Sequence, residues 1–245
     1  CGYAHPGKTQ RAGDAWIVFR RGNAAETLAH MHDWHRLVGH LPPEGRPESV
    51  KSLALYATHP KGRGMSEPGG FPHAQEYLPF VAALGINTIW LRPVEHKSGY
   101  CPDEMYELQE GIGTPADHLA YVRDAHRRGL KVWRDAVMHG GKTDNRRSKE
   151  HPEWVCLKPD GKQADTYWAY DFNWPTWVKY FGDYVEWTTR KYEIDGWRMD
   201  VPTGSRFPNW NPKVPYDRAS YAQNQGGLAQ MRSIRAAARR ATSTR

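Results

Sequence analysis

The sequence predicts an α/β protein that contains about the first four βα units of a (β/α)8 TIM barrel, with a short loop domain after the third strand. Strand-like and helix-like segments alternate from residue 50 onward, which is the order of a parallel sheet with crossover helices. Their lengths suit barrel units. Only four strands are predicted in the 245 residues, whereas a complete barrel takes about 250 residues for eight units.

The first predicted unit begins at residues 52–59, SLALYATH, which have the composition of a strand. Residues 73–85, HAQEYLPFVAALG, predict a helix that Gly85 ends. We expect the buried face of this helix to hold Tyr77, Phe80, Val81 and Leu84. Residues 86–94, INTIWLRPV, predict the second strand, which ends at Pro93.

The third unit centres on a helix predicted for residues 114–130. Thr114 is a typical N-cap, Pro115 suits the first turn, and Gly129 ends the helix. Its inward positions are expected to be Leu119, Val122 and Ala125. Residues 131–138, KVWRDAVM, predict the third strand.

The fourth unit starts with a helix predicted for residues 176–192. Its apolar line holds Trp177, Phe181, Tyr184 and Thr188. Residues 194–201, IDGWRMDV, predict the fourth strand, and residues 227–241 a last helix. The apolar line of that helix holds Leu228, Met231 and Ile234.

The N-terminal region has a different composition. Residues 1–49 are rich in Gly, His and Pro, and we expect an N-terminal extension, or the end of an upstream module, followed by a linker. Residues 50–245 are expected to form the N-terminal half of the barrel domain. Because the chain begins at Cys1 rather than Met, we interpret it as a fragment, in preference to a mature lipoprotein.

Composition argues against several classes of partner. The net charge is +7, and basic residues gather near the C-terminus: Arg232, Arg235, Arg239, Arg240 and Arg245. Such a run is typical of a solvated helix face, and since no basic-aromatic module accompanies it, we expect no nucleic-acid partner. Three cysteines without a CxxC pair indicate neither a disulfide framework nor a zinc site, and we expect no cofactor. No run approaches the ~20 apolar residues of a membrane span.

The fourth predicted strand carries two charged residues, Arg198 and Asp200. Side chains alternate along a strand, so these two share one face while Trp197 and Met199 face the helices. Asp200 then lies at the carboxyl end of the strand, where barrel enzymes place their chemistry. An adjacent arginine keeps such a carboxylate ionised, as a covalent nucleophile requires. A purely structural ion pair is the alternative.

The motif IDGWRMDV resembles the fourth-strand motif of the alpha-amylase family of glycoside hydrolases (family 13), in the form typical of neopullulanase and cyclomaltodextrin hydrolase. Residues 84–94, LGINTIWLRPV, are similar to the second strand of that family. Residues 98–139 follow it from a sugar-stacking Gly-Tyr through the third strand. The resemblance covers about residues 50–240, and it implies a retaining hydrolase or transglycosylase of carbohydrate metabolism that acts on alpha-glucans or alpha-glucosides.

The resemblance also implies roles for individual residues. Asp200 would be the nucleophile that forms a covalent glycosyl-enzyme, and Arg198 would keep it ionised and oriented. Tyr100 would stack on the sugar at the cleavage point, unless it is simply a loop tyrosine packed on its neighbours. Asp135 would support the site by hydrogen bonding at the end of the third strand.

The chain departs from the family just after Asp135. The family usually has Asn-His where this chain has His139 followed by Gly140, so the histidine that bonds sugar hydroxyls is displaced by one residue. His139 would therefore bind substrate from a shifted loop, or be an exposed loop histidine. The family asparagine that often ligates calcium is absent, and we expect no metal.

Residues 139–175 correspond to the protruding loop domain of the family, here short. This segment is unusually aromatic, with Tyr167, Trp168, Tyr170, Phe172 and Trp174. These side chains would form either a sugar-stacking wall or a cluster that holds the loop on the barrel.

A retaining glycosidase needs a second carboxyl group as acid and base. In the family this is a glutamate on the fifth strand, and a further aspartate follows the seventh. Glu104, Glu110 and Glu153 match neither position. We therefore expect the isolated chain to be inactive and to self-associate through its open barrel edge. A non-catalytic carbohydrate-binding remnant is the alternative function.

Overall fold

The computed structural model describes residues 17, 19, 21–29, 31–37, 48–62, 69–97, 100–164, 170–201, 209–213 and 223–243. The chain forms two compact units, one containing Ala54–Arg245 and one spanning Thr9–Leu53. In the smaller unit lie two short helices, α1 (Ala24–Ala29) and α2 (Met31–Leu37), and a 3₁₀ turn, η1 (Glu48–Val50). The expectation that residues 1–49 are an extension with a linker stays a prediction.

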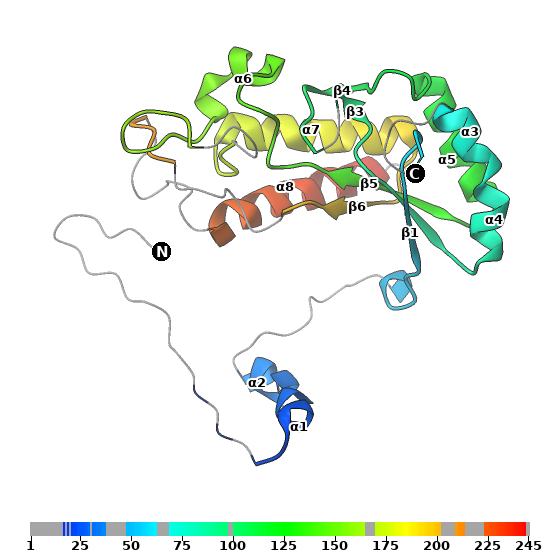
Figure 1. Ribbon diagram of the computed structural model, residues 1–245, viewed down its shortest axis with the longest axis horizontal. Helices are drawn as coiled ribbons and strands as arrows, with labels where there is room; N and C mark the ends of the chain where they lie inside the picture. The colour runs from blue at the N-terminus through cyan, green and yellow to red at the C-terminus, as the bar shows by residue number, and fades with distance from the viewer. Residues whose placement is uncertain are drawn as a thin grey trace. The chain divides into compact units, whose positions relative to one another are not determined.

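The larger unit is built on a four-stranded parallel sheet with the strand order β1-β2-β5-β6 (Figure 1). These strands are β1 (Leu55–Thr58), β2 (Thr88–Leu91), β5 (Lys131–Ala136) and β6 (Gly196–Met199). Each strand pairs in parallel with the next of these along the chain. Sequential parallel pairing with helical crossovers is the connectivity of a (β/α)8 barrel, and the predicted partial barrel is confirmed.

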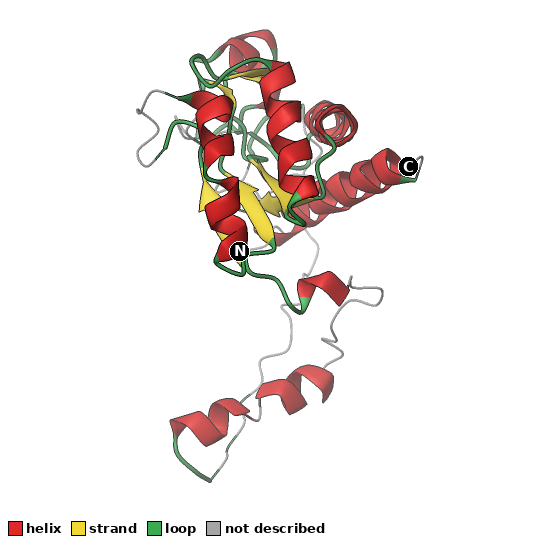
Figure 2. Cartoon of the chain, turned by 90° about the vertical axis from the view of Figure 1, so that its right-hand side faces the viewer, coloured by secondary structure: helices red, strands yellow, loops and turns green. Residues whose placement is uncertain are grey.

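Helices cover one face of this sheet: α3 (Gly70–Glu76), α4 (Leu78–Ala83), α5 (Pro115–Arg127), α7 (Pro175–Tyr192) and α8 (Gln223–Thr242). α3 packs on α5, α5 on α7 and α7 on α8, so the helices follow the order of the strands. Figure 2 shows them in red beside the yellow strands. No helix within the described ranges is both long and apolar enough to cross a membrane.

Two helices form much as their sequences predict. Thr114 caps α5, since its Oγ1 accepts from the Asp117 backbone N–H at 3.2 Å and the Asp117 carboxylate accepts from the Thr114 N–H at 2.7 Å. The predicted apolar line of α7 is buried, and Trp177, Phe181 and Tyr184 are each at most 1% exposed. In α8, Ile234 is buried as expected, whereas the Leu228 side chain lies outside the described residues.

The predicted helix over residues 73–85 is wrong in its bounds and in its buried face. Tyr77 ends α3, and α4 begins at Leu78 with Pro79 in its first turn. Pro79 has no N–H to continue the α3 hydrogen bonds, so the helix breaks and its phase restarts. Leu78 and Val81 are buried, while Tyr77, Phe80 and Leu84 are more than half exposed.

A small layer covers the carboxyl end of the sheet. It contains an antiparallel hairpin that the sequence analysis missed, β3 (Glu95–His96) with β4 (Glu104–Leu108), and also α6 (Arg146–Glu150) and a 3₁₀ turn, η2 (Pro152–Trp154). Tyr170 and Phe172 are buried in one cluster with Trp154 and Trp177. These two aromatic residues hold the loop on the barrel rather than form a sugar-stacking wall. Tyr167 and Trp168 lie outside the described residues.

Candidate active site

The carboxyl ends of β2, β5 and β6 bring the candidate residues together. Asp135 on β5 stands opposite Arg198 on β6 in the parallel register, so both side chains leave the same face of the sheet. Trp197 leaves the other face, and its indole N–H donates to the Thr189 hydroxyl of α7 at 3.0 Å. The alternation predicted for this strand is therefore present.

Arg198 is the centre of the site. Its Nη1 donates to both oxygens of Asp135 at 3.2 Å and to Asp200 Oδ1 at 2.6 Å. Its guanidinium also lies over the Trp90 ring, 4.7 Å from the ring centroid. One guanidinium thus fixes two carboxylates while an aromatic face supports it.

Asp200 is held at the point where β6 ends. Its backbone N–H donates to Ala136 O at 3.1 Å, which extends the ladder by one residue. The Nε2 of His139 lies 3.0 Å from Asp200 Oδ2. Burial alone would raise the pKa of Asp200, but hydrogen bonds from His139 and Arg198 outweigh it and lower this pKa below its usual value. The Asp200 side chain remains 14% exposed, so an ionised carboxylate is accessible at the strand end.

His139 is not an exposed loop histidine, because its side chain is 1% exposed. Gly140 follows it with φ 75°, and a Cβ there would overlap the Tyr170 ring. Glycine therefore lets the loop turn and pack closely behind His139. The structure places His139 on Asp200, and its contact with a sugar stays a prediction.

Asp135 is fully buried beneath the Arg198 guanidinium. The indole N–H of Trp90 donates to Asp135 Oδ2 at 3.1 Å, and the Tyr100 hydroxyl donates to the same oxygen at 3.3 Å. Burial raises the pKa of Asp135 to about 6, although the charge and hydrogen bonds of Arg198 act in the opposite direction. The pKa values of the two aspartates are therefore shifted in opposite directions, and Asp200 is the one that holds its proton less tightly.

Tyr100 contacts Asp135, so it belongs to the site rather than to a separate loop cluster. Burial and the nearby Asp135 charge raise the pKa of Tyr100, so its hydroxyl stays protonated and serves as a donor. Whether the ring stacks on a sugar stays a prediction.

Two residues of the site were missed in the sequence. Trp90 and Arg92 occupy alternate positions on β2 and just after it, so both share the face that bears Asp135. Arg92 lies against the Tyr100 hydroxyl as a hydrogen-bond donor. Residues 90–93, WLRP, carry the sequence signal for both. Alternation of side chains along a strand puts Trp90 and Arg92 on one face, as it does Arg198 and Asp200.

The other acidic residues considered have different surroundings. Glu104 is buried and accepts from the Tyr180 hydroxyl at 2.8 Å, and it pairs with Arg146 and Arg147. Glu153 lies beside His151. Among the described residues no three His, Cys, Asp or Glu side chains converge closely enough to hold a metal ion.

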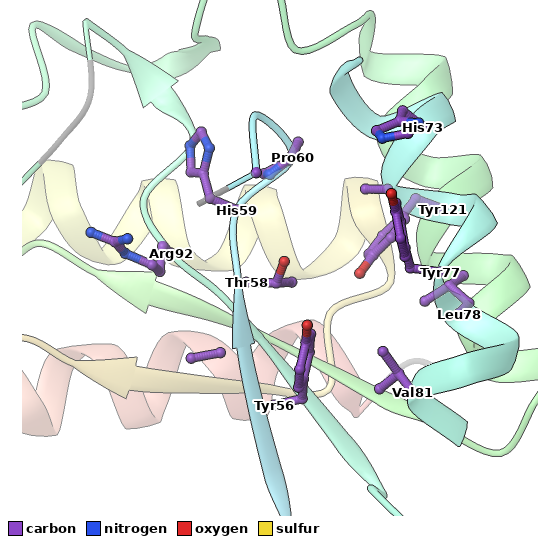
Figure 3. A pocket seen from close by; sticks show the side chains of 13 residues that line it. Tyr56, Thr58, His59, Pro60, His73, Tyr77, Leu78, Val81, Arg92 and Tyr121 are labelled. Atoms are coloured by element: carbon purple, nitrogen blue, oxygen red, sulfur yellow. The ribbon is translucent and has the colours of Figure 1, made fainter. Parts of the chain in front are cut away.

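A cavity of about 350 Å³ lies against β1, at the edge of the sheet (Figure 3). On the side of the helices it is lined by Tyr56, Tyr77, Leu78 and Val81. His59 and Arg92 line it on the other side of β1. Asp200 does not line it, so we interpret the cavity as space beside the edge strand of the described sheet rather than as the candidate site.

A parallel sheet with functional side chains gathered at its carboxyl end is the arrangement of (β/α)8-barrel enzymes. The family model for the alpha-amylase catalytic domain matches residues 19–189. The chain therefore belongs to the alpha-amylase family.

Individual relatives agree with this assignment. An oligo-1,6-glucosidase of Bacillus sp. (strain F5) is 26% identical over 195 residues, which cover 62% of this chain and 38% of the relative. An oligo-1,6-glucosidase of Halalkalibacterium halodurans is 28% identical, covering 67% of this chain and 30% of the relative. The crystal structure of a Bacillus licheniformis trehalose-6-phosphate hydrolase matches the fold with a TM-score of 0.62 at 20% identity. The match covers 78% of this chain and 43% of that protein. The chain thus spans well under half the length of each of these proteins.

Proposed function

We propose that this chain carries the nucleophile side of a retaining hydrolase or transglycosylase site that acts on alpha-glucosides or alpha-glucans. The observation that carries the proposal is the Arg198–Asp200 pair at the end of β6, with His139 on the second Asp200 oxygen. An ionised, oriented and partly exposed carboxylate has the properties that attack on a sugar carbon needs.

In the proposed reaction, an Asp200 oxygen attacks the anomeric carbon of the glucoside. A covalent glycosyl ester forms as the bond to the leaving oxygen breaks, and that oxygen must receive a proton. Arg198 holds Asp200 ionised before the attack, and Asp135 keeps Arg198 in place. Water or a second sugar then takes the glycosyl group and restores Asp200.

The proton donor is proposed to come from outside these residues. Within the described part of the chain, the side chains hydrogen-bonded to Asp200 are those of Arg198 and His139, and no glutamate contacts it. We therefore infer that the 245 residues alone give no catalytic turnover. The names of the relatives, two oligo-1,6-glucosidases and a trehalose-6-phosphate hydrolase, favour short alpha-glucosides as substrates.

The test is hydrolysis of short alpha-glucosides by the protein at its full encoded length. We expect turnover that releases the alpha anomer first, seen by proton NMR, and a loss of at least about 10³-fold for Asp200→Asn. Asp183→Asn, an exposed aspartate on α7, is the matched control and should keep the activity. Sugar binding without turnover, unchanged by Asp200→Asn, would favour the carbohydrate-binding remnant instead.

A further inference from the structure

Arg92 is a charged residue of the site with no role in the proposed reaction. Its backbone N–H donates to Thr58 O at 2.9 Å, which extends the β1–β2 ladder and fixes the residue at the strand end. Its side chain is half-buried and is drawn beside His59, to one side of β1 (Figure 3). Regular sheet structure thus holds Arg92 at the carboxyl end of β2, where its side chain lies against Tyr100.

Arg92 differs from Arg198 in its charged neighbours. Arg198 pairs with two carboxylates, those of Asp135 and Asp200. Arg92 forms no ion pair with a carboxylate in the parts of the chain that the structure describes. Its polar neighbour is the Tyr100 hydroxyl, whose own hydrogen is donated to Asp135.

His59, which lines the same cavity as Arg92, does not balance the Arg92 charge. The Lys61 N–H donates to His59 Nδ1 at 3.1 Å, and Nε2 lies 3.1 Å from Pro93 O. Both ring nitrogens are therefore used to hold the ends of β1 and β2 together, in a neutral tautomer. Among the described residues, the charge of Arg92 is therefore left without a carboxylate partner.

A neutral sugar that covers an unpaired guanidinium removes water from it and returns only neutral hydrogen bonds. A carboxylate or phosphate group returns two parallel charge-assisted bonds, and the planar fork of arginine matches both groups. We propose that Arg92 is a specificity-determining residue, and that the sugar bound next to Asp200 carries an anionic substituent, a phosphate or a carboxylate, which Arg92 binds. The inference rests on the proposed function and names its substrate class.

The test measures covalent labelling of Asp200 in the protein at its full encoded length. Fluorinated alpha-glucosyl fluoride is the neutral probe: the Asp200 oxygen bonds to the anomeric carbon, the C–F bond breaks, and fluoride leaves with the electron pair and needs no acid. Two anionic probes of the same design carry a phosphate on a remote hydroxyl or the carboxylate of a glucuronosyl ring. Labelling rates at limiting probe concentration are followed by intact-protein mass spectrometry.

We expect at least one anionic probe to label the wild type about ten-fold faster than the neutral probe. Arg92→Gln should abolish this preference, because the rates with the anionic probes fall about ten-fold relative to the rate with the neutral probe, and Arg92→Lys should restore part of it. Arg123→Gln, an exposed arginine on α5, is the matched control and should change neither rate. Whichever anionic probe is preferred identifies the substituent.

Two results would overturn the inference. One is a wild type that labels faster with the neutral probe than with both anionic probes. The other is an equal loss of all rates in Arg92→Gln, which would mean that Arg92 only positions Tyr100. Failure of the wild type to react with any of the three probes would instead contradict the proposed function, and the inference would fall with it.

Discussion

Arg198→Met removes the guanidinium that holds Asp200 ionised and leaves an apolar side chain of similar length. The lost contact is the 2.6 Å hydrogen bond from Nη1 to Asp200 Oδ1. A hydrogen bond to a charged group contributes about 1.5–3 kcal/mol. The Arg198 side chain is 34% exposed, so solvent screening places the effect near the lower end of this range. That corresponds to an increase of about one unit in the pKa of Asp200.

The pH dependence of Asp200 labelling by fluorinated alpha-glucosyl fluoride measures this change. Only the ionised carboxylate attacks, so the labelling rate falls on the acidic side as Asp200 takes up a proton. We expect the acidic limb of the Arg198→Met profile to lie about one pH unit above that of the wild type. Arg198→Lys keeps the charge without the fork and should give a smaller displacement.

Arg123→Met, an exposed arginine on α5, controls for general effects of losing a surface charge. Its acidic limb should coincide with that of the wild type. An acidic limb that does not move in Arg198→Met would refute the reasoning, because Asp200 would then be kept ionised by something other than Arg198.

Three further predictions concern stability and association. The folded-state pKa of Asp135 is about 6, which lies above the unfolded value of about 4. Between these two pH values the folded state holds a proton that the unfolded state releases. The free energy of unfolding should therefore fall by ~2–3 kcal/mol as pH rises from about 4 to about 6. Asp135→Asn should lack this decrease in urea titrations, and an unchanged pH dependence would contradict the assigned pKa. Gly140→Ala should lower the free energy of unfolding by about 2 kcal/mol or more in the same titrations, because its Cβ would overlap the Tyr170 ring. Gly161→Ala, also at positive φ but in open space, should lower it by about 1 kcal/mol. The 245-residue chain should self-associate in size-exclusion chromatography, and Phe80→Lys on the exposed face of α4 should reduce the association; a monomeric wild type would contradict this expectation.

Much of the fold could be predicted because its signals are local. The apolar line of α7 follows from 3.6-residue spacing, and the capping box of α5 lies within four residues. The β3–β4 hairpin was missed because β3 is two residues long and its pairing depends on contacts across a loop. The α3–α4 break was missed because apolar spacing was followed through Pro79, where a missing N–H ends the helix.

The site was predictable to the extent that strand alternation places side chains. Alternation put Arg198 and Asp200 on one face, and the same rule applied to β2 would have found Trp90 and Arg92. The position of His139 was not predictable, since the loop after β5 decides whether a histidine there reaches Asp200 or solvent. The raised pKa of Asp135 also required the structure, because it depends on burial beneath Arg198.

The measurement that tests the central claim most directly is peptide mapping of the protein after reaction with fluorinated alpha-glucosyl fluoride. The account predicts one glucosyl group per chain, attached as an ester to the Asp200 side chain and absent in Asp200→Asn. A glucosyl group on another carboxylate, or labelling that persists in Asp200→Asn, would contradict the assignment of Asp200 as the nucleophile.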